Sequence, residues 1–131
     1  MHDIHKNGLE NNIMLRGVVS EEEKIKLLKQ SKVCVFLSYI EGWGLVPIEA
    51  LACGLPVVAY ELPVYKENIK NCEAAFLVPI GDYKSAAEKV IELLSINELF
   101  NLSQKSKVFA SQFDWNEIAK KEFNVLVNGT V

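Results

Sequence analysis

Short apolar runs alternate with segments of helical periodicity from the start of the chain to about residue 95. The runs have the length and the continuous apolar character of buried strands. They predict strands at residues 13–16, 33–37, 56–60 and 75–78. The segments that follow them predict helices at residues 21–30, 46–53, 63–68 and 83–95.

This alternation predicts a parallel sheet flanked by helices, because parallel strands need crossover connections. Residues 97–111 and 115–128 then predict two C-terminal helices with no strand between them. Four strands are fewer than the five or six of a complete doubly wound sheet. The expected fold class is therefore α/β: a Rossmann-like parallel sheet flanked by helices, N-terminally truncated, with two C-terminal helices.

The bulk properties remove several classes of function. A length of 131 residues predicts one domain, residues 1–131. A net charge of −3 with no clustered basic face argues against nucleic-acid binding. No apolar run approaches the roughly 20 residues of a membrane span, and the N-terminus has no signal-peptide core. The three cysteines form no CxxC motif or zinc-ligand spacing, so we expect no metal and a reducing, cytoplasmic setting.

The candidate chemistry lies in the run EGWGLVPIE, from Glu41 to Glu49. It places Glu41 in a glycine-rich loop after a predicted strand, and Glu49 in the first turn of the following helix. Gly42 and Gly44 permit close approach of a ligand to the backbone, and the helix N-terminus favours an anion. Two carboxylates beside such a site suit a ligand that carries both phosphates and hydroxyls, such as a nucleotide sugar.

A purely structural interpretation of the same run stays open on spacing alone. A glycine pair after a strand is common, and the helix dipole favours a glutamate in a first turn.

A longer stretch of the sequence around this run resembles a known protein family. The run SYIEGWGLVPIEALACGLPVVA, residues 38–59, resembles the donor-binding C-terminal half of the family 4 (group 1) retaining glycosyltransferases, whose hallmark is Glu-x7-Glu. The segment AFLVPIGD at 75–82 is similar to that family's later strand and turn. Phe113-Asp114-Trp115 resembles the start of its terminal crossover helix. The match covers nearly the whole chain.

The resemblance implies a GT-B fold, two Rossmann-like domains facing a cleft, and transfer of a sugar from a nucleotide sugar to an acceptor glycan or lipid. It implies a hexosyltransferase-type reaction with retention and no bound metal or other cofactor. Glu41 is then the catalytic-site residue that faces the donor sugar, and Glu49 binds the ribose. The backbone at Gly42, Trp43, Gly44 and Leu45 lies near the sugar and diphosphate. For the Trp43 ring we favour packing, and Glu67 is expected at the surface.

The family's N-terminal acceptor domain and its diphosphate-binding Arg and Lys have no counterpart in the sequence. We therefore expect the isolated chain to be inactive without an N-terminal domain or partner chain. An exposed edge strand could instead support self-association. The alternative function is a catalytically silent nucleotide-sugar-binding or interaction module. The whole enzyme is expected to be cytoplasmic, with peripheral membrane attachment as an option. The base, sugar and acceptor are not specified.

Overall fold

A three-stranded parallel sheet forms the centre of the computed structural model, which describes residues 2–129. The strands are β1 (Cys34–Phe36), β2 (Val57–Tyr60) and β3 (Ala75–Val78), in the order β1-β2-β3. Val58 of β2 lies in register with Val35 on one side and Phe76 on the other. The predicted strands at 33–37, 56–60 and 75–78 are confirmed; β1 and β2 are slightly shorter than expected, and β3 has the expected bounds.

Helices connect the strands and cover the sheet. In chain order they are α1 (His2–Lys6), α2 (Glu21–Gln30), α3 (Leu45–Ala52), α4 (Pro63–Asn68), α5 (Tyr83–Ser95), α6 (Leu99–Ala110) and α7 (Trp115–Asn128), with a 3-10 turn, η1 (Ser111–Phe113), before α7. All four residues of β2 are buried, and successive strand side chains point to opposite faces. Both faces of the sheet are therefore covered, with α3 against β1 and β2 and α5 against β2 and β3.

The helix starts follow the sequence signals. Ser20 Oγ accepts a hydrogen bond from the Glu23 N–H at 3.2 Å and caps α2. Asp82 caps α5 and Asp114 caps α7 in the same way. Side-chain caps satisfy backbone donors that the helix itself leaves unpaired.

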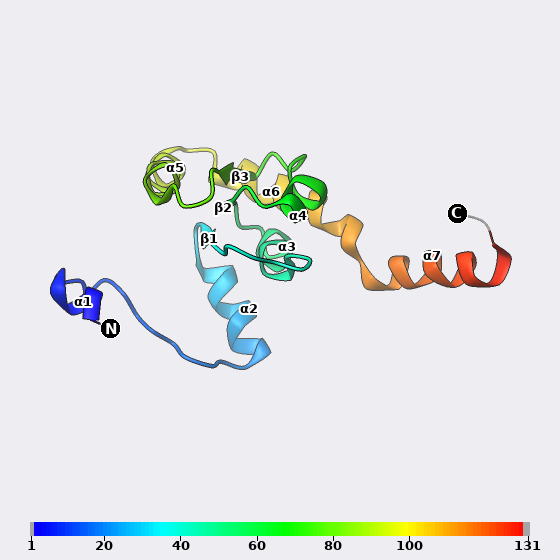
Figure 1. Ribbon diagram of the computed structural model, residues 1–131, viewed down its shortest axis with the longest axis horizontal. Coiled ribbons are helices and arrows are strands. Elements are labelled where there is room, and N and C mark those ends of the chain that lie inside the picture. The colour runs from blue at the N-terminus through cyan, green and yellow to red at the C-terminus, as the bar shows by residue number, and fades with distance from the viewer. Residues whose placement is uncertain (1, 130–131) are drawn as a thin grey trace.

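The predicted strand at 13–16 is wrong. These residues run from α1 to α2 without strand pairing, and Figure 1 shows this connection away from the sheet. Ile13, Met14 and Leu15 are all exposed. A strand exists only through hydrogen bonds to a neighbouring strand, and within residues 2–129 no strand lies beside this segment. Apolar character alone therefore could not make it a strand.

The two C-terminal helices differ in how they are packed. Helix α6 packs along α3, and Ser106 at its centre is fully buried. The Ser106 Oγ lies 2.8 Å from the Leu102 carbonyl oxygen and 3.2 Å from that of Leu55, just before β2. Helix α7 has no buried residue and projects from the body of the molecule (Figure 1). The described core therefore ends with α6 and η1.

Candidate functional site

The glycine-rich loop lies at the carboxyl end of β1 and leads directly into α3. Helix α3 begins at Leu45, one residue earlier than predicted, so Glu49 is its fifth residue and not in its first turn as expected. Gly44 is the N-cap, and no side chain of residues 2–129 caps this helix. The first N–H groups of α3 therefore carry the positive end of the helix dipole without a side-chain acceptor.

Gly44 has two structural reasons to be glycine. Its φ is +85°, in the left-handed region that residues with a Cβ adopt at a cost. A Cβ built on it would lie 2.3 Å from Cε1 of Tyr65, a fully buried residue of α4. The close approach that the sequence suggested is thus made to Tyr65 inside the protein. Gly42, in contrast, is exposed, and a Cβ there would meet no atom within 4 Å in the described structure.

The Tyr65 ring packs against Gly44 of the glycine-rich loop. Its hydroxyl is buried without a hydrogen-bond partner among the described residues. Burial, and to a lesser extent the nearby charges of Glu41 and Cys34, together raise the pKa of Tyr65 to about 12. The phenol therefore stays neutral over the whole physiological pH range.

Glu41 lies in a hollow at the carboxyl ends of β1 and β2, which we call the β1-end hollow. Its volume is about 350 Å³. The hollow is lined by Tyr39, Ile40, Glu41, Gly42, Leu62, Pro63, Val64 and Glu67. Glu67 is exposed, as predicted, and its place in the same hollow brings a second carboxylate to it. This is the sheet edge at which ligands bind in open α/β folds.

Glu49 is held by an ion pair. Its Oε1 lies 3.0 Å from Nζ of Lys24 on α2, and Lys24 also pairs with Glu21 at 2.7 Å. These two carboxylates raise the pKa of Lys24, Glu21 more than Glu49, so the ammonium stays charged. The Glu49 side chain remains 40% exposed. One carboxylate oxygen is therefore engaged while the side chain stays accessible.

A second hollow, the aromatic hollow, lies beside Glu49 between α3 and the start of α7. Its volume is about 240 Å³. It is lined by Trp43, Leu45, Ile48, Glu49, Ala52, Ala110, Phe113, Trp115 and Ile118. The Trp43 ring packs edge-on against Phe113 with ring centroids 5.5 Å apart, in agreement with the packing role that we favoured. The Asn68 side-chain amide donates to the Trp43 carbonyl oxygen at 3.0 Å and ties the loop to α4.

The structure thus divides the predicted site residues between two neighbouring hollows. Glu41 and Gly42 line the β1-end hollow, whereas Trp43, Leu45 and Glu49 line the aromatic hollow. Gly44, between Trp43 and Leu45 in the chain, lines neither hollow and is buried against the Tyr65 ring. The uncapped start of α3, at Gly44 and Leu45, lies between Glu41 and Glu49 in the chain.

Sequence reasoning missed three residues that shape this site, namely Lys24, Tyr65 and Asn68. Each acts through a contact with a residue at least 21 positions away along the chain, so no local motif marks it. The sequence marks Lys24 only as one residue of the predicted helix at 21–30. Its acidic neighbours 21–23 are exposed, as a solvated helix face should be.

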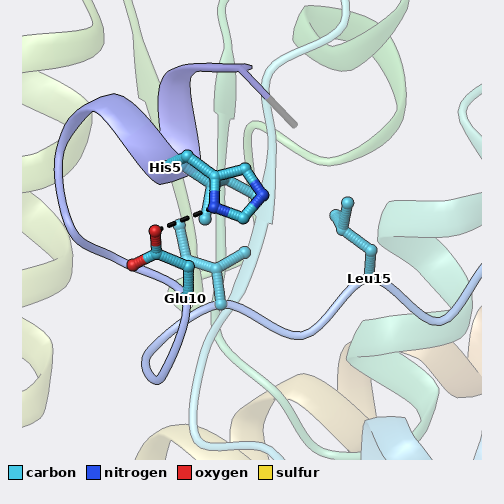
Figure 2. A pocket seen from close by; sticks show the side chains of 5 residues that line it. His5, Glu10 and Leu15 are labelled. Atoms are coloured by element: carbon cyan, nitrogen blue, oxygen red, sulfur yellow. Dashed lines mark hydrogen bonds and ion pairs between the residues drawn. The ribbon is translucent and has the colours of Figure 1, made fainter.

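A third hollow lies near the N-terminus and contains none of the predicted site residues. It measures about 210 Å³ and is lined by Ile4, His5, Glu10, Ile13 and Leu15. Figure 2 shows the His5 ring nitrogen directed at the Glu10 carboxylate, 2.8 Å away. A hydrogen bond to its own backbone N–H, and then His5, lower the pKa of Glu10. Both side chains are exposed, and the hollow is formed by residues 4–15 alone.

Within residues 2–129, the cysteines, the possible metal ligands and the helices indicate no further functional site. Burial raises the pKa of the Cys34 thiol to about 11 and also raises that of Cys72, so neither is a reactive thiolate at neutral pH. Within residues 2–129, no three His, Cys, Asp or Glu side chains gather as metal ligands would. None of the helices in that range combines the length and the apolar character that crossing a membrane requires.

Comparison with known proteins points to one family. Residues 2–110 match the family described as glycosyl transferases group 1. The chain is 33% identical over 113 residues to the capsular polysaccharide biosynthesis glycosyltransferase CapM of Staphylococcus aureus, covering 82% of this chain and 29% of that protein. It is 29% identical over 122 residues to the phosphatidyl-myo-inositol mannosyltransferase of Mycobacterium leprae, covering 90% and 32%.

A solved structure gives the same result for the fold. The sucrose-phosphate synthase of Thermosynechococcus elongatus matches with a TM-score of 0.87 and 26% sequence identity, over 95% of this chain and 32% of that one. The expected Rossmann-like α/β fold of the GT-B kind is thereby confirmed. The chain spans about 30% of the length of the relatives and of the structure that it matches.

Proposed function

The chain belongs to the glycosyl transferases group 1 family, and from this premise we propose that it is the donor-binding part of a retaining, hexosyltransferase-type enzyme. In the proposed reaction, the bond between the anomeric carbon of the donor sugar and the nucleoside diphosphate breaks. A bond to an acceptor hydroxyl oxygen of a glycan or lipid forms on the same face. The diphosphate leaves with the electrons of the broken bond, and the proton of the acceptor hydroxyl passes to it. No metal or other cofactor is part of the proposal.

One observation carries the assignment: the uncapped start of α3 stands between the two carboxylates of the Glu-x7-Glu run. A helix N-terminus of this kind attracts a diphosphate. Glu49 of α3, whose side chain is accessible, then accepts hydrogen bonds from the ribose diol. Glu41, at the end of β1, faces the donor sugar and stabilises positive charge that develops at the anomeric carbon. The backbone at Gly42, Trp43, Gly44 and Leu45 lies along the sugar and diphosphate.

The proposal includes a limit on the chain alone. We expect it to bind nucleotide weakly and not to transfer sugar by itself, because the resemblance assigns the acceptor site and the diphosphate-binding cations to other parts of the enzyme. Those cations contribute several kcal/mol to a transition state of this type. A separate acceptor-binding domain or chain would complete the site. Robust turnover by the chain alone, measured with nucleotide-sugar donors, would refute this part.

The direct experiment is a calorimetric or NMR titration with UDP, GDP and ADP, repeated on Glu49→Ala. We expect weak binding of at least one nucleotide, and affinity at least tenfold lower in the variant, since a carboxylate that accepts two hydroxyl hydrogen bonds contributes on the order of 1.5–3 kcal/mol. If none of the three binds at millimolar concentration, the donor site is not functional in this chain. Equal binding by wild type and variant would remove Glu49 from the site.

The open edge of β1 favours a second candidate function. Within the described residues β1 has a neighbour on one side only, and Val35 is 48% exposed. An unpaired edge of this kind can add a strand from another chain. The chain would then be a catalytically silent nucleotide-sugar-binding or interaction module. Stable self-association without any nucleotide binding would favour this candidate over the enzyme.

A further inference from the structure

An ion pair between Lys24 and Glu49 joins helix α2 to helix α3. Lys24 Nζ lies 3.0 Å from Glu49 Oε1, and the two residues are 25 positions apart in the sequence. The Lys24 side chain is 30% exposed and that of Glu49 is 40% exposed, so the ion pair is partly buried. The partly buried setting distinguishes this pair from ion pairs within α2 and α5, which join residues three positions apart.

We propose that Lys24 is a positioning residue, which holds the Glu49 carboxylate in the orientation that receives the ribose diol of the donor nucleotide. This inference rests on the proposed function, because it takes Glu49 as the ribose-binding residue. An ionised carboxylate offers about four lone-pair sites on its two oxygens. The ammonium uses one site on Oε1, and within residues 2–129 no other side chain pairs with Oε2, which can accept hydroxyl hydrogens.

The physical reason is the cost of ordering a side chain on binding. Immobilising a flexible side chain at a binding site costs conformational entropy. The ion pair fixes the Glu49 rotamer before the nucleotide arrives, so this cost is already met in the free protein.

A simpler role for the pair is to fasten α2 onto α3. An ion pair that is still partly exposed adds little to stability. A fastening role predicts that loss of Lys24 weakens folding and affects every ligand alike. A positioning role predicts an effect that depends on the ribose hydroxyls and on the presence of Glu49. The two roles are therefore separable by choice of ligand and by a double-mutant cycle.

The experiment uses the 131-residue chain and whichever of UDP, GDP and ADP binds best, together with its 2′,3′-dideoxy counterpart. Titrations compare the wild type with Lys24→Met, Lys24→Arg, Glu49→Ala and the double variant Lys24→Met/Glu49→Ala. Lys26→Met is the matched control, since Lys26 lies on the same helix and has no ion pair within residues 2–129. Thermal unfolding of each variant shows whether it is folded.

We expect Lys24→Met to bind the ribonucleotide about three- to tenfold more weakly. The dideoxynucleotide should bind equally to Lys24→Met and wild type, and adding Lys24→Met to Glu49→Ala should change nothing further. Lys24→Arg keeps a charge that can reach the carboxylate and should stay within about twofold of wild type, as should Lys26→Met.

Other outcomes would contradict either the role of Lys24 alone or the donor-site assignment itself. If Glu49→Ala weakens binding but Lys24→Met does not, Lys24 has no positioning role and the donor site stands. The same holds if Lys24→Met weakens ribonucleotide and dideoxynucleotide equally, or acts in full when Glu49 is absent. If Glu49→Ala itself binds as well as wild type, or no nucleotide binds at all, the donor-site assignment fails and this inference with it.

Discussion

At the scale of single residues, the loop between β1 and α3 depends on one glycine and one tyrosine. Gly44 combines a positive φ with a direct contact to the Tyr65 ring, which is itself part of the buried core. Gly42, two residues earlier, has neither constraint. The two glycines of the run are thus different in kind: one is required by the fold, and the other is open to solvent and to a ligand.

Replacement of Gly44 by alanine should therefore destabilise the protein. A left-handed conformation for a residue with a Cβ and a clash against a buried ring each cost about 1–3 kcal/mol. Urea denaturation measures the loss in free energy of unfolding. Gly42→Ala is the matched control and should change that free energy by less than about 0.5 kcal/mol. Equal stability of both variants would contradict the packing seen around Gly44.

Tyr65 predicts a loss of stability at high pH. Its pKa is raised from 10.0 to about 12 in the folded state, so the folded protein holds the phenol proton more tightly than the unfolded chain. The resulting stability is complete below pH 10 and is lost as pH rises from 10 towards 12, by up to about 1.4 kcal/mol per pH unit. Denaturation midpoints measured between pH 8 and 11.5 should fall less steeply in Tyr65→Phe than in wild type.

At the scale of elements, α6 is fastened to the sheet through a buried polar contact. Ser106 is the only buried polar or charged residue in the core of the described range, and both of its acceptors are backbone carbonyls. An unpaired hydroxyl is costly to bury, and the hydrogen bonding of Ser106 avoids that cost. The loop before β2 and the middle of α6 are thereby held together, and α6 in turn packs on α3, which carries Glu49.

Ser106→Ala should lower the free energy of unfolding by about 1 kcal/mol, the usual net value of such a hydrogen bond. Ser111→Ala is a suitable control, because its hydroxyl also donates to a backbone carbonyl, that of Val108, but is exposed. We expect the control to stay within about 0.5 kcal/mol of wild type in the same urea titration. If Ser106→Ala leaves the free energy of unfolding unchanged, the buried hydrogen bonding of Ser106 contributes nothing to stability.

At the scale of the whole molecule, the apolar surface is unevenly covered. The core gathers around β2, α3, α4 and α6, whereas Val35 on the β1 edge and apolar residues of the connection to α2 and of α7 remain exposed. Figure 1 shows that connection and α7 extending from opposite ends of the body. Surfaces of this kind favour association with another chain or domain.

If the chain self-associates through the β1 edge, Val35→Lys should shift it to monomer. A lysine on an edge strand opposes pairing with a further strand by charge and desolvation. Sedimentation velocity over a concentration series measures the shift. Ile91→Lys, at an exposed position of α5, controls for the added charge. Dimers that survive Val35→Lys would exclude this edge as the contact.

Much of the fold was predictable because its signals are local. Apolar runs marked β1, β2 and β3, and cap residues such as Ser20, Asp82 and Asp114 marked helix starts. The strand at 13–16 could not be judged in this way, since pairing depends on what lies beside it. The division of the site into two hollows could not be predicted from the sequence either, because it depends on where α4 and the start of α7 pack.

The sequence by itself determined the parallel α/β class, the position of the glycine-rich loop at the end of β1, and the pair of carboxylates eight residues apart. These follow from periodicity and from residue types within short windows. Only the tertiary structure decided that Lys24 meets Glu49, that Tyr65 fills the space beside Gly44, and that Glu67 joins Glu41 in one hollow. The reason is physical: each of these contacts joins separate elements, and packing of those elements brings together residues that no local pattern connects.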